Sequence, residues 1–243
     1  MSARGGPRDP PSARPATTIV GVYAERPFPG LACVWQRTTS SAAVGRVVPD
    51  GCTDIIYSTA TGQVHVAGPD TVGHVTSMAP GTLFGVRFGP GVGPSAFGLP
   101  AVELRDQRVP LSELWGPSAR LEDALGAASD PCSVLAAAAL ARLRETPPDP
   151  SVGAIASFSG NVGDLAWTLG LSTRQLHRRS LAAFGYGPKV LHRVLRFDRA
   201  VKLAWAGVPF ADIAHRTGYS DQAHLAREVR DLAGVPLGQL IRS

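Results

Sequence analysis

The sequence predicts an α+β protein in which a β-rich N-terminal domain, a barrel or a sandwich, precedes an all-α domain with two helix-turn-helix units joined by a long helix. Three observations support this prediction. Short runs rich in β-branched and aromatic residues fill the first part of the chain. A proline-rich stretch at 147–151 interrupts it. The last third contains an internal near-repeat with an offset of 48 residues.

The N-terminal 18 residues, MSARGGPRDPPSARPATT, are rich in Pro, Gly, Ser and Arg, and we expect them to be disordered. They lack the apolar segment of a secretory leader. The longest apolar run, at 134–140, is too short to cross a membrane. We therefore expect a cytoplasmic protein with no membrane partner.

Residues 19–146 are predicted to form the β-rich domain, with helices at its end. The predicted strands are LACVW, GRVV, TDIIYS, QVHVAG and LFGVRF, which occupy 31–35, 45–48, 53–58, 63–68 and 83–88. Pro, Gly and Asp at 49–51 and 68–70 mark turns between them. Regular short strands of this kind favour a sandwich or a barrel.

A glycine-rich segment at 89–100 follows the strands. It lacks the GK[ST] ending of a phosphate-binding loop, so it predicts a turn that leaves the sheet. Helices are then expected at 111–116 and at 133–145, the second with Ser133 as its N-cap. The second helix is apolar enough to pack on the sheet or on a second subunit.

The near-repeat aligns DLAWTLGLS at 164–172 with DIAHRTGYS at 212–220. The shared alanine, Ala166 or Ala214, lets two helices cross closely, and the glycine that follows lets the chain turn sharply. Ser172 and Ser220 are placed to cap or introduce a second helix. Each copy therefore predicts a helix-turn-helix unit, a motif whose second helix enters the DNA major groove.

The charge distribution also favours an anionic partner. Residues 160–243 hold 12 Lys and Arg against 6 Asp and Glu, whereas 1–159 hold 12 Arg against 13 Asp and Glu. A helix predicted at 188–206 would span roughly 28 Å at about 1.5 Å per residue. That length would place the two units over adjacent major-groove segments.

From about Ser151 onward the chain resembles the DNA-binding domain of the AraC/XylS family, most closely in GYSDQAHLAREVRDLAGVP at 218–236. The first unit departs from the family pattern at Ser180, where the family usually has a buried Phe, and Phe184 lies one turn further on. The resemblance implies a sequence-specific DNA-binding transcription regulator. The expected regions are a tail at 1–18, a sensor and dimerisation domain at 19–146, a linker at 147–151, and a DNA-binding domain at 152–243 with units at about 162–184 and 209–233.

The N-terminal part resembles a cupin-like domain found ahead of AraC-type units. VPDGCTDII, GVRFGPG and VPLSELWG, at 48–56, 85–91 and 109–116, carry this resemblance. It implies a β domain that senses a small molecule or forms dimers.

The expected DNA-binding residues lie on the second helix of each unit and at the start of the long helix. They are Thr173, Arg174, His177, Arg178, Lys189, Asp221, Gln222, Ala223, His224 and Arg227. Arg can bind guanine and Gln can bind adenine through paired hydrogen bonds. Two alternatives stay open: Arg178 and Arg227 could pair with Asp164 or Asp212, and Lys189, Arg193, Arg196 and Arg199 could contact phosphates or form a solvated face.

An effector pocket is expected around Trp35, Asp54 and Arg87, with core packing as the alternative for these residues. His65, His74, Asp50, Asp54 and Asp70 lack the spacing of a cupin metal site, and Cys33, Cys52 and Cys132 lack zinc spacing. We therefore expect no metal, no cofactor and no enzymatic activity.

The expected partner is double-stranded DNA, in a nucleoid-associated setting. RNA polymerase, a small-molecule effector and a homodimer are further candidate partners. The alternative functions are a protein-interaction module and a redox or small-molecule sensor with only non-specific DNA affinity, in which Cys52 would be the redox group.

Overall fold

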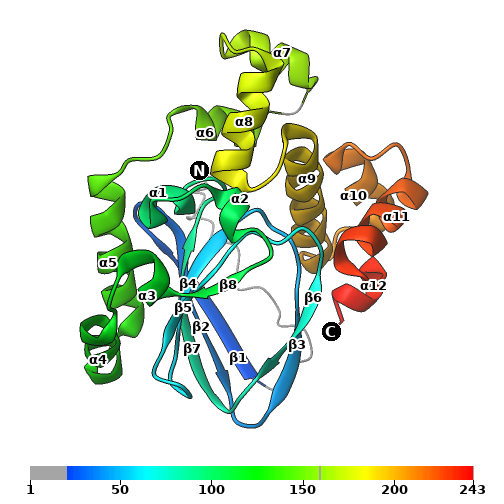
Figure 1. Ribbon diagram of the computed structural model, residues 1–243. Coiled ribbons are helices and arrows are strands. Elements are labelled where there is room, and N and C mark those ends of the chain that lie inside the picture. Colours follow the sequence, from blue (N-terminus) through cyan, green and yellow to red (C-terminus); the bar gives the residue numbers. More distant parts are fainter. Residues whose placement is uncertain (1–20, 159, 243) are drawn as a thin grey trace, which may run out of the picture.

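The computed structural model describes residues 21–158 and 160–242. The predicted tail at 1–18 lies outside these residues. A β-rich N-terminal part is followed by a helical C-terminal part, which confirms the predicted fold class (Figure 1). None of the helices in the described ranges is long and apolar enough to cross a membrane.

Six antiparallel strands form the main sheet, in the order β1-β2-β7-β4-β5-β8. Their bounds are Gly21–Phe28 for β1, Leu31–Thr39 for β2, Gly81–Phe88 for β7, Thr53–Ser58 for β4, Val64–Ala67 for β5 and Arg108–Pro110 for β8. A separate two-stranded ribbon pairs β3 (Ala43–Val47) with β6 (His74–Met78). The sequence did not predict β1, β6 or β8, because these strands are short, contain proline or are half exposed.

Strand alternation divides the residues of the main sheet between two faces. Val34, Ile55, Val66 and Val86 point to one face and are fully buried in a core beneath helix α5 (Pro131–Glu145). Figure 1 shows α5 beside that face and the β3–β6 ribbon beyond the opposite one. The opposite face is therefore free to line a cavity.

Short helices connect the sheet to α5. They are α1 (Gly93–Phe97), α2 (Ala101–Leu104), α3 (Leu111–Trp115) and α4 (Ala119–Ala127). The predicted N-cap of α5 was wrong. Asp130, not Ser133, caps this helix, because its carboxylate accepts a hydrogen bond from the Ser133 backbone N–H.

The helical part consists of two helix pairs arranged around the long helix α9 (Pro188–Trp205). The other helices are α6 (Ser151–Ser157), α7 (Val162–Thr168), α8 (Thr173–Phe184), α10 (Phe210–Thr217), α11 (Gln222–Ala233) and α12 (Leu237–Leu240). The first half of α9 buries Leu191 and Val194 among α6–α8, and its second half buries Phe197 and Val201 among α10–α12. One helix thus holds both pairs.

The second helix of each pair begins at a well-formed cap. Ser172 and Gln175 form a reciprocal capping box at the start of α8, as the sequence indicated for Ser172. Ser220 precedes α11 but does not cap it: Asp221 is the N-cap and accepts a hydrogen bond from His224 N–H at 2.6 Å. The turn after Gly218 is one residue longer than the turn after Gly170.

Ser180 is compatible with a packed first pair. Its side chain is fully buried, and its hydroxyl donates a hydrogen bond to the Tyr186 carbonyl at 2.7 Å. Phe184 is also buried and lies against Gly91, where a Cβ would approach the Phe184 ring to 2.5 Å. Ser180 therefore provides a hydrogen-bond donor for the Tyr186 carbonyl in the turn before α9, while Phe184 fills the space toward the sheet.

Candidate nucleic-acid interface and interdomain cavity

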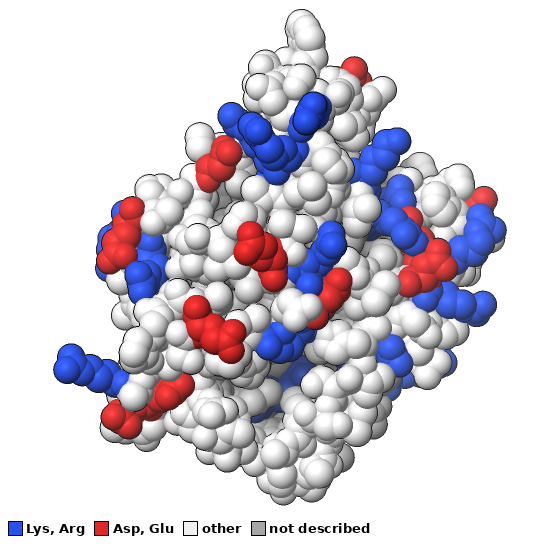
Figure 2. Space-filling model, in the orientation of Figure 1, with Lys and Arg blue, Asp and Glu red and all other residues white. Residues whose placement is uncertain are grey.

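The first candidate surface lies on α8. Thr173, Arg174, His177 and Arg178 are exposed there, whereas Leu176 on the opposite side of the helix is fully buried. Figure 2 shows Lys and Arg side chains gathered over the region of α8 and again around α9–α11. The helix thus presents polar and cationic groups on one side and is held by its apolar side.

The matching surface on α11 has the same construction. Gln222, Ala223 and Arg227 are exposed, and Leu225 is buried. His224 is half-buried: its ring packs edge-on against Tyr219 at 5.1 Å, and its Nδ1 lies 3.2 Å from the Ser220 hydroxyl. His224 therefore also contributes to packing.

The cations expected to contact DNA form no ion pair within 4 Å in the described residues. Among residues 21–158 and 160–242, no ion pair involves Arg174, Arg178, Lys189 or Arg227. The suggested pairing of Arg178 and Arg227 with Asp164 or Asp212 is thus not found. These cations are available to an anionic partner.

Two other arginines have a different role. Arg193 and Arg196 of α9 both form ion pairs with Glu228 of α11, a contact that the sequence did not indicate. Glu228 is buried and also accepts a hydrogen bond from the Tyr219 hydroxyl at 2.8 Å. Burial and the Glu228 carboxylate raise the pKa of the Tyr219 hydroxyl, which keeps it protonated as a donor.

The N-terminal part contacts the carboxyl ends of both α8 and α11. Arg105 donates a hydrogen bond to the Gly185 carbonyl at 3.1 Å, and Arg46 donates one to the Ala233 carbonyl at 2.9 Å. The Tyr186 hydroxyl, just after α8, donates to the Asp70 carbonyl. These cations satisfy carbonyls that a helix end leaves unpaired, so the N-terminal part positions both helices.

A cavity of about 1140 Å³ lies on the free face of the main sheet. The β3–β6 ribbon, α9 and α12 supply further walls through residues that include Arg46, Met78, Phe197, Trp205 and Leu240, and α4 contributes Glu122. Both parts of the chain therefore line one cavity. Trp35, Asp54 and Arg87, the residues expected at an effector pocket, all line it.

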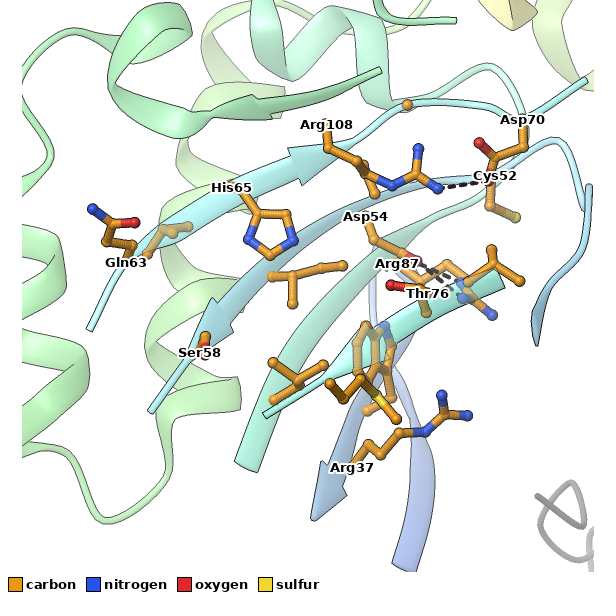
Figure 3. A pocket seen from close by; sticks show the side chains of 18 of the residues that line it. Arg37, Cys52, Asp54, Ser58, Gln63, His65, Asp70, Thr76, Arg87 and Arg108 are labelled. Atoms are coloured by element: carbon orange, nitrogen blue, oxygen red, sulfur yellow. Dashed lines mark hydrogen bonds and ion pairs between the residues drawn. The ribbon is translucent and has the colours of Figure 1, made fainter. Parts of the chain in front are cut away.

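Several charged groups in the cavity neutralise each other (Figure 3). The Arg87 guanidinium binds Asp54 through Nε and Nη2 at 3.0 and 2.9 Å and lies 3.5 Å from Asp50. These carboxylates raise the pKa of Arg87 against the opposing effect of its burial. Arg108 forms a second pair with Asp70, at 2.7 Å.

The residues considered for redox chemistry or metal binding, Cys52 and His65 among them, lie in surroundings that disfavour these roles. Burial raises the pKa of the Cys52 thiol well above its usual value, and Asp50 raises it further, so the reactive thiolate is disfavoured. Burial lowers the pKa of His65, which favours its neutral form. Within the described ranges, no three His, Cys, Asp or Glu side chains form a group that could hold a metal ion.

Four further arginines with cavity or interdomain contacts were not predicted from the sequence: Arg37, Arg46, Arg105 and Arg108. Arg37 and Arg108 are on strands, and the period-2 alternation that places Trp35 and Arg87 on the cavity face also places Arg37 there. That signal was present in the sequence. Arg46 and Arg105 act across the two parts of the chain, and no local pattern reveals such a contact.

Two family models match the chain. Residues 165–243 match a helix-turn-helix domain, and residues 29–110 match a domain of unknown function (DUF6597). No match was found among curated proteins.

Solved structures of ToxT from Vibrio cholerae are similar over most of the chain. One, determined at 1.65 Å resolution, is 8% identical, covers 90% of this chain and 98% of its own, and gives a TM-score of 0.46. Another, wild-type ToxT of strain SCE256 bound to an unsaturated fatty acid, is 9% identical, covers 94% and 97%, and gives a TM-score of 0.41.

Proposed function

We propose that the protein is a transcription regulator of the AraC type that reads DNA sequence with α8 and α11, because residues 165–243 match a helix-turn-helix domain and contain both helices. One observation carries the proposal: two capped helices each expose arginines without carboxylate partners opposite a buried leucine. Such helices can enter adjacent major-groove segments while α9 holds their spacing.

Base reading is assigned to the long polar side chains. Arg174 and Arg178 of α8 and Arg227 of α11 can each bind guanine O6 and N7, and Gln222 can bind adenine N6 and N7. His177 and His224 supply further ring nitrogens, and Ala223 can contact a thymine methyl group. Each good paired contact discriminates against the wrong base by about 1–3 kcal/mol.

Positioning on the DNA backbone is assigned to other residues. Lys189 is exposed in the first turn of α9 and can contact a phosphate, as can the Thr173 hydroxyl. Asp221 acts at the interface through its cap on α11, which fixes the start of that helix.

The cavity is assigned to an effector. Arg46 and Asp70 both line it, and the same residues contact the carboxyl end of α11 and the segment just after α8. A ligand that shifts either residue would therefore shift a proposed DNA-reading helix. RNA polymerase contact and a homodimer stay predictions.

The competing function is a protein-interaction module with only non-specific DNA affinity. Sites selected from random duplexes by the full-length chain, followed by titrations across salt concentrations, separate the two. Sequence-specific binding predicts an enriched motif, and each phosphate contact lowers the slope of log K against log salt by about 0.9. No enriched motif, or a flat salt dependence, contradicts the proposal.

A further inference from the structure

Among the arginines that line the cavity, Arg37 differs in having neither an ion pair nor a side-chain hydrogen bond within the described residues. Within residues 21–158 and 160–242, the Arg37 guanidinium forms no ion pair, and its buried Nε has no hydrogen-bond partner. It lies over the Tyr23 ring, with its central carbon 5.1 Å from the ring centroid. Glu25 is on the neighbouring strand, but its carboxylate accepts a hydrogen bond from the Tyr23 hydroxyl at 2.7 Å.

Trp35 adds a second unsatisfied donor on the same strand face. Its side chain is 7% exposed, and its indole lies directly over Gly85, where a Cβ would come within 2.1 Å of the ring. Its Nε1–H has no hydrogen-bond partner among the described residues. Because this nitrogen is buried against Gly85, Trp35 offers a ligand in the cavity the apolar surface of its ring.

The other charged groups of the cavity wall already have partners. Arg87 is paired with Asp54 and Asp50, and Arg108 with Asp70. Arg46 donates to the Ala233 carbonyl, and Glu122 accepts from the Ser118 hydroxyl at 3.0 Å. Figure 3 shows Arg37 extending from its strand apart from the dashed Asp54–Arg87 and Arg108–Asp70 contacts.

The half-buried position of Arg37 is costly without an anion. Removal of a guanidinium from water disfavours its charged form, and burial lowers the pKa of Arg37; Tyr23 opposes this effect and the charge of Arg87 adds to it. A bound anion would offset both contributions. A neutral ligand would leave the cost of burial in place, and a cationic ligand would add a repulsion to it.

The surface beside Arg37 is apolar. Leu83 is its paired residue on β7, Ile56 pairs with Gly85 beneath Trp35, and Met78 lines the cavity from the ribbon. An anion bound here would thus have its hydrocarbon or aromatic part against these side chains.

We propose that the ligand of this cavity is a small organic acid whose anionic group binds the Arg37 guanidinium and whose apolar body packs against Trp35, Leu83 and Met78. This inference rests on the proposed assignment of the cavity to an effector. Beyond that assignment, it specifies the charge of the ligand, the residue that binds its charged group and the orientation of the bound ligand.

A matched pair of fluorescent probes tests it with the full-length chain. 1-Anilinonaphthalene-8-sulfonate carries an acid group on an apolar body, and N-phenyl-1-naphthylamine has the same body without that group. We expect the sulfonate to bind at one site at least about tenfold more tightly than the neutral probe, since hydrogen bonds to charged groups are the stronger ones. Equal affinities, or no binding of the sulfonate, overturn the proposal.

The variant Arg37→Gln keeps a polar side chain but removes the charge. It should weaken sulfonate binding at least about tenfold and leave the neutral probe within about twofold. Arg144→Gln, at an exposed arginine of α5 outside the cavity, is the control and should change neither. If Arg37→Gln weakens the binding of both probes equally, or leaves the binding of both unchanged, a charge-binding role for Arg37 is contradicted.

Arg37→Lys covers the case in which Arg37→Gln does not fold. It retains the cation and should keep a preference for the sulfonate over the neutral probe, and loss of that preference in a folded Arg37→Lys protein counts against the proposal. DNA binding measured on the same samples separates the two ideas. A regulator that binds DNA but shows no anion preference refutes the ligand inference alone, whereas anion binding without specific DNA binding refutes the proposed function alone.

Discussion

Arg196 donates hydrogen bonds to both carboxylate oxygens of Glu228. Its Nη2 lies 2.9 Å from Oε1 and 2.7 Å from Oε2, and its Nε lies 3.1 Å from Oε1. The same guanidinium lies over the Tyr219 ring, 4.5 Å from the ring centroid. Because Arg196 is on α9 and Glu228 on α11, this pair fixes the proposed second DNA-reading helix against the helix that joins the two units.

The first prediction is that Glu228→Gln destabilises the protein by about 2 kcal/mol. Breaking a buried ion pair costs about 3–5 kcal/mol, and the cost falls here because Arg196 is 27% exposed. Urea denaturation measures it. Asp231→Asn is the control, because that carboxylate is 65% exposed in its pair with Arg193 and should contribute less than about 1 kcal/mol. Equal losses in the two variants would contradict the structural role of Glu228.

The Arg196–Glu228 pair also shows where sequence reasoning reached its limit. The near-repeat and its glycines predicted both helix pairs and the long helix, because turn chemistry and helical periodicity are local signals. A pairing between residues 32 positions apart is not local. Arg196 was therefore interpreted as a surface cation when it is a packing residue.

The same distinction holds in the β-rich part. Trp35 and Arg87 were placed in a pocket because they are on predicted strands, and strand alternation then puts Arg37 on the same face. The β3–β6 ribbon closes the cavity, but β6 has the polar sequence HVTSM and gives no strand signal in isolation. The partner strand, not the local sequence, determines that it is extended.

A second prediction concerns Ser180. Because its side chain is fully buried and donates to the Tyr186 carbonyl, Ser180→Ala should cost about 1 kcal/mol by loss of one hydrogen bond. Ser180→Phe, which introduces the aromatic residue usual in the AraC/XylS family, should cost more, about 1–3 kcal/mol beyond that, by overpacking beside Phe184. Thermal unfolding of the three proteins gives the order, and a Phe variant as stable as the natural protein would contradict it.

A third prediction concerns the thiols. Burial raises the pKa of both Cys52 and Cys132, so the thiolate fraction of each near pH 7.5 is lower than that of an exposed cysteine. In the native protein, Ellman's reagent should modify both slowly, and in guanidinium it should modify them fast. Cys52→Ser identifies the contribution of Cys52. A fast native reaction that this variant abolishes would instead favour the redox-sensor alternative.

A fourth prediction links the N-terminal part to the second DNA-reading helix. Arg46→Gln removes the cation that donates to the Ala233 carbonyl, so amide hydrogens in the last turn of α11 should exchange faster. Affinity for a selected DNA site should change by more than about twofold, because α11 is less firmly held. Arg144→Gln serves as the control. If amide exchange in the last turn of α11 is unchanged, the contact between Arg46 and Ala233 does not link the cavity to this helix.

The final prediction separates base reading from phosphate contact. Arg174→Ala should weaken binding to a selected site by about 1–3 kcal/mol and relax the preference at one base position, because a paired contact to guanine is lost. Lys189→Ala should weaken binding to all sequences alike and reduce the salt slope by about 0.9. Binding selections and salt titrations of the two variants give both quantities. If Arg174→Ala keeps the full base preference while Lys189→Ala alters it, the proposed division between α8 and the start of α9 is wrong, and the docking of the first unit on DNA must differ from the major-groove arrangement.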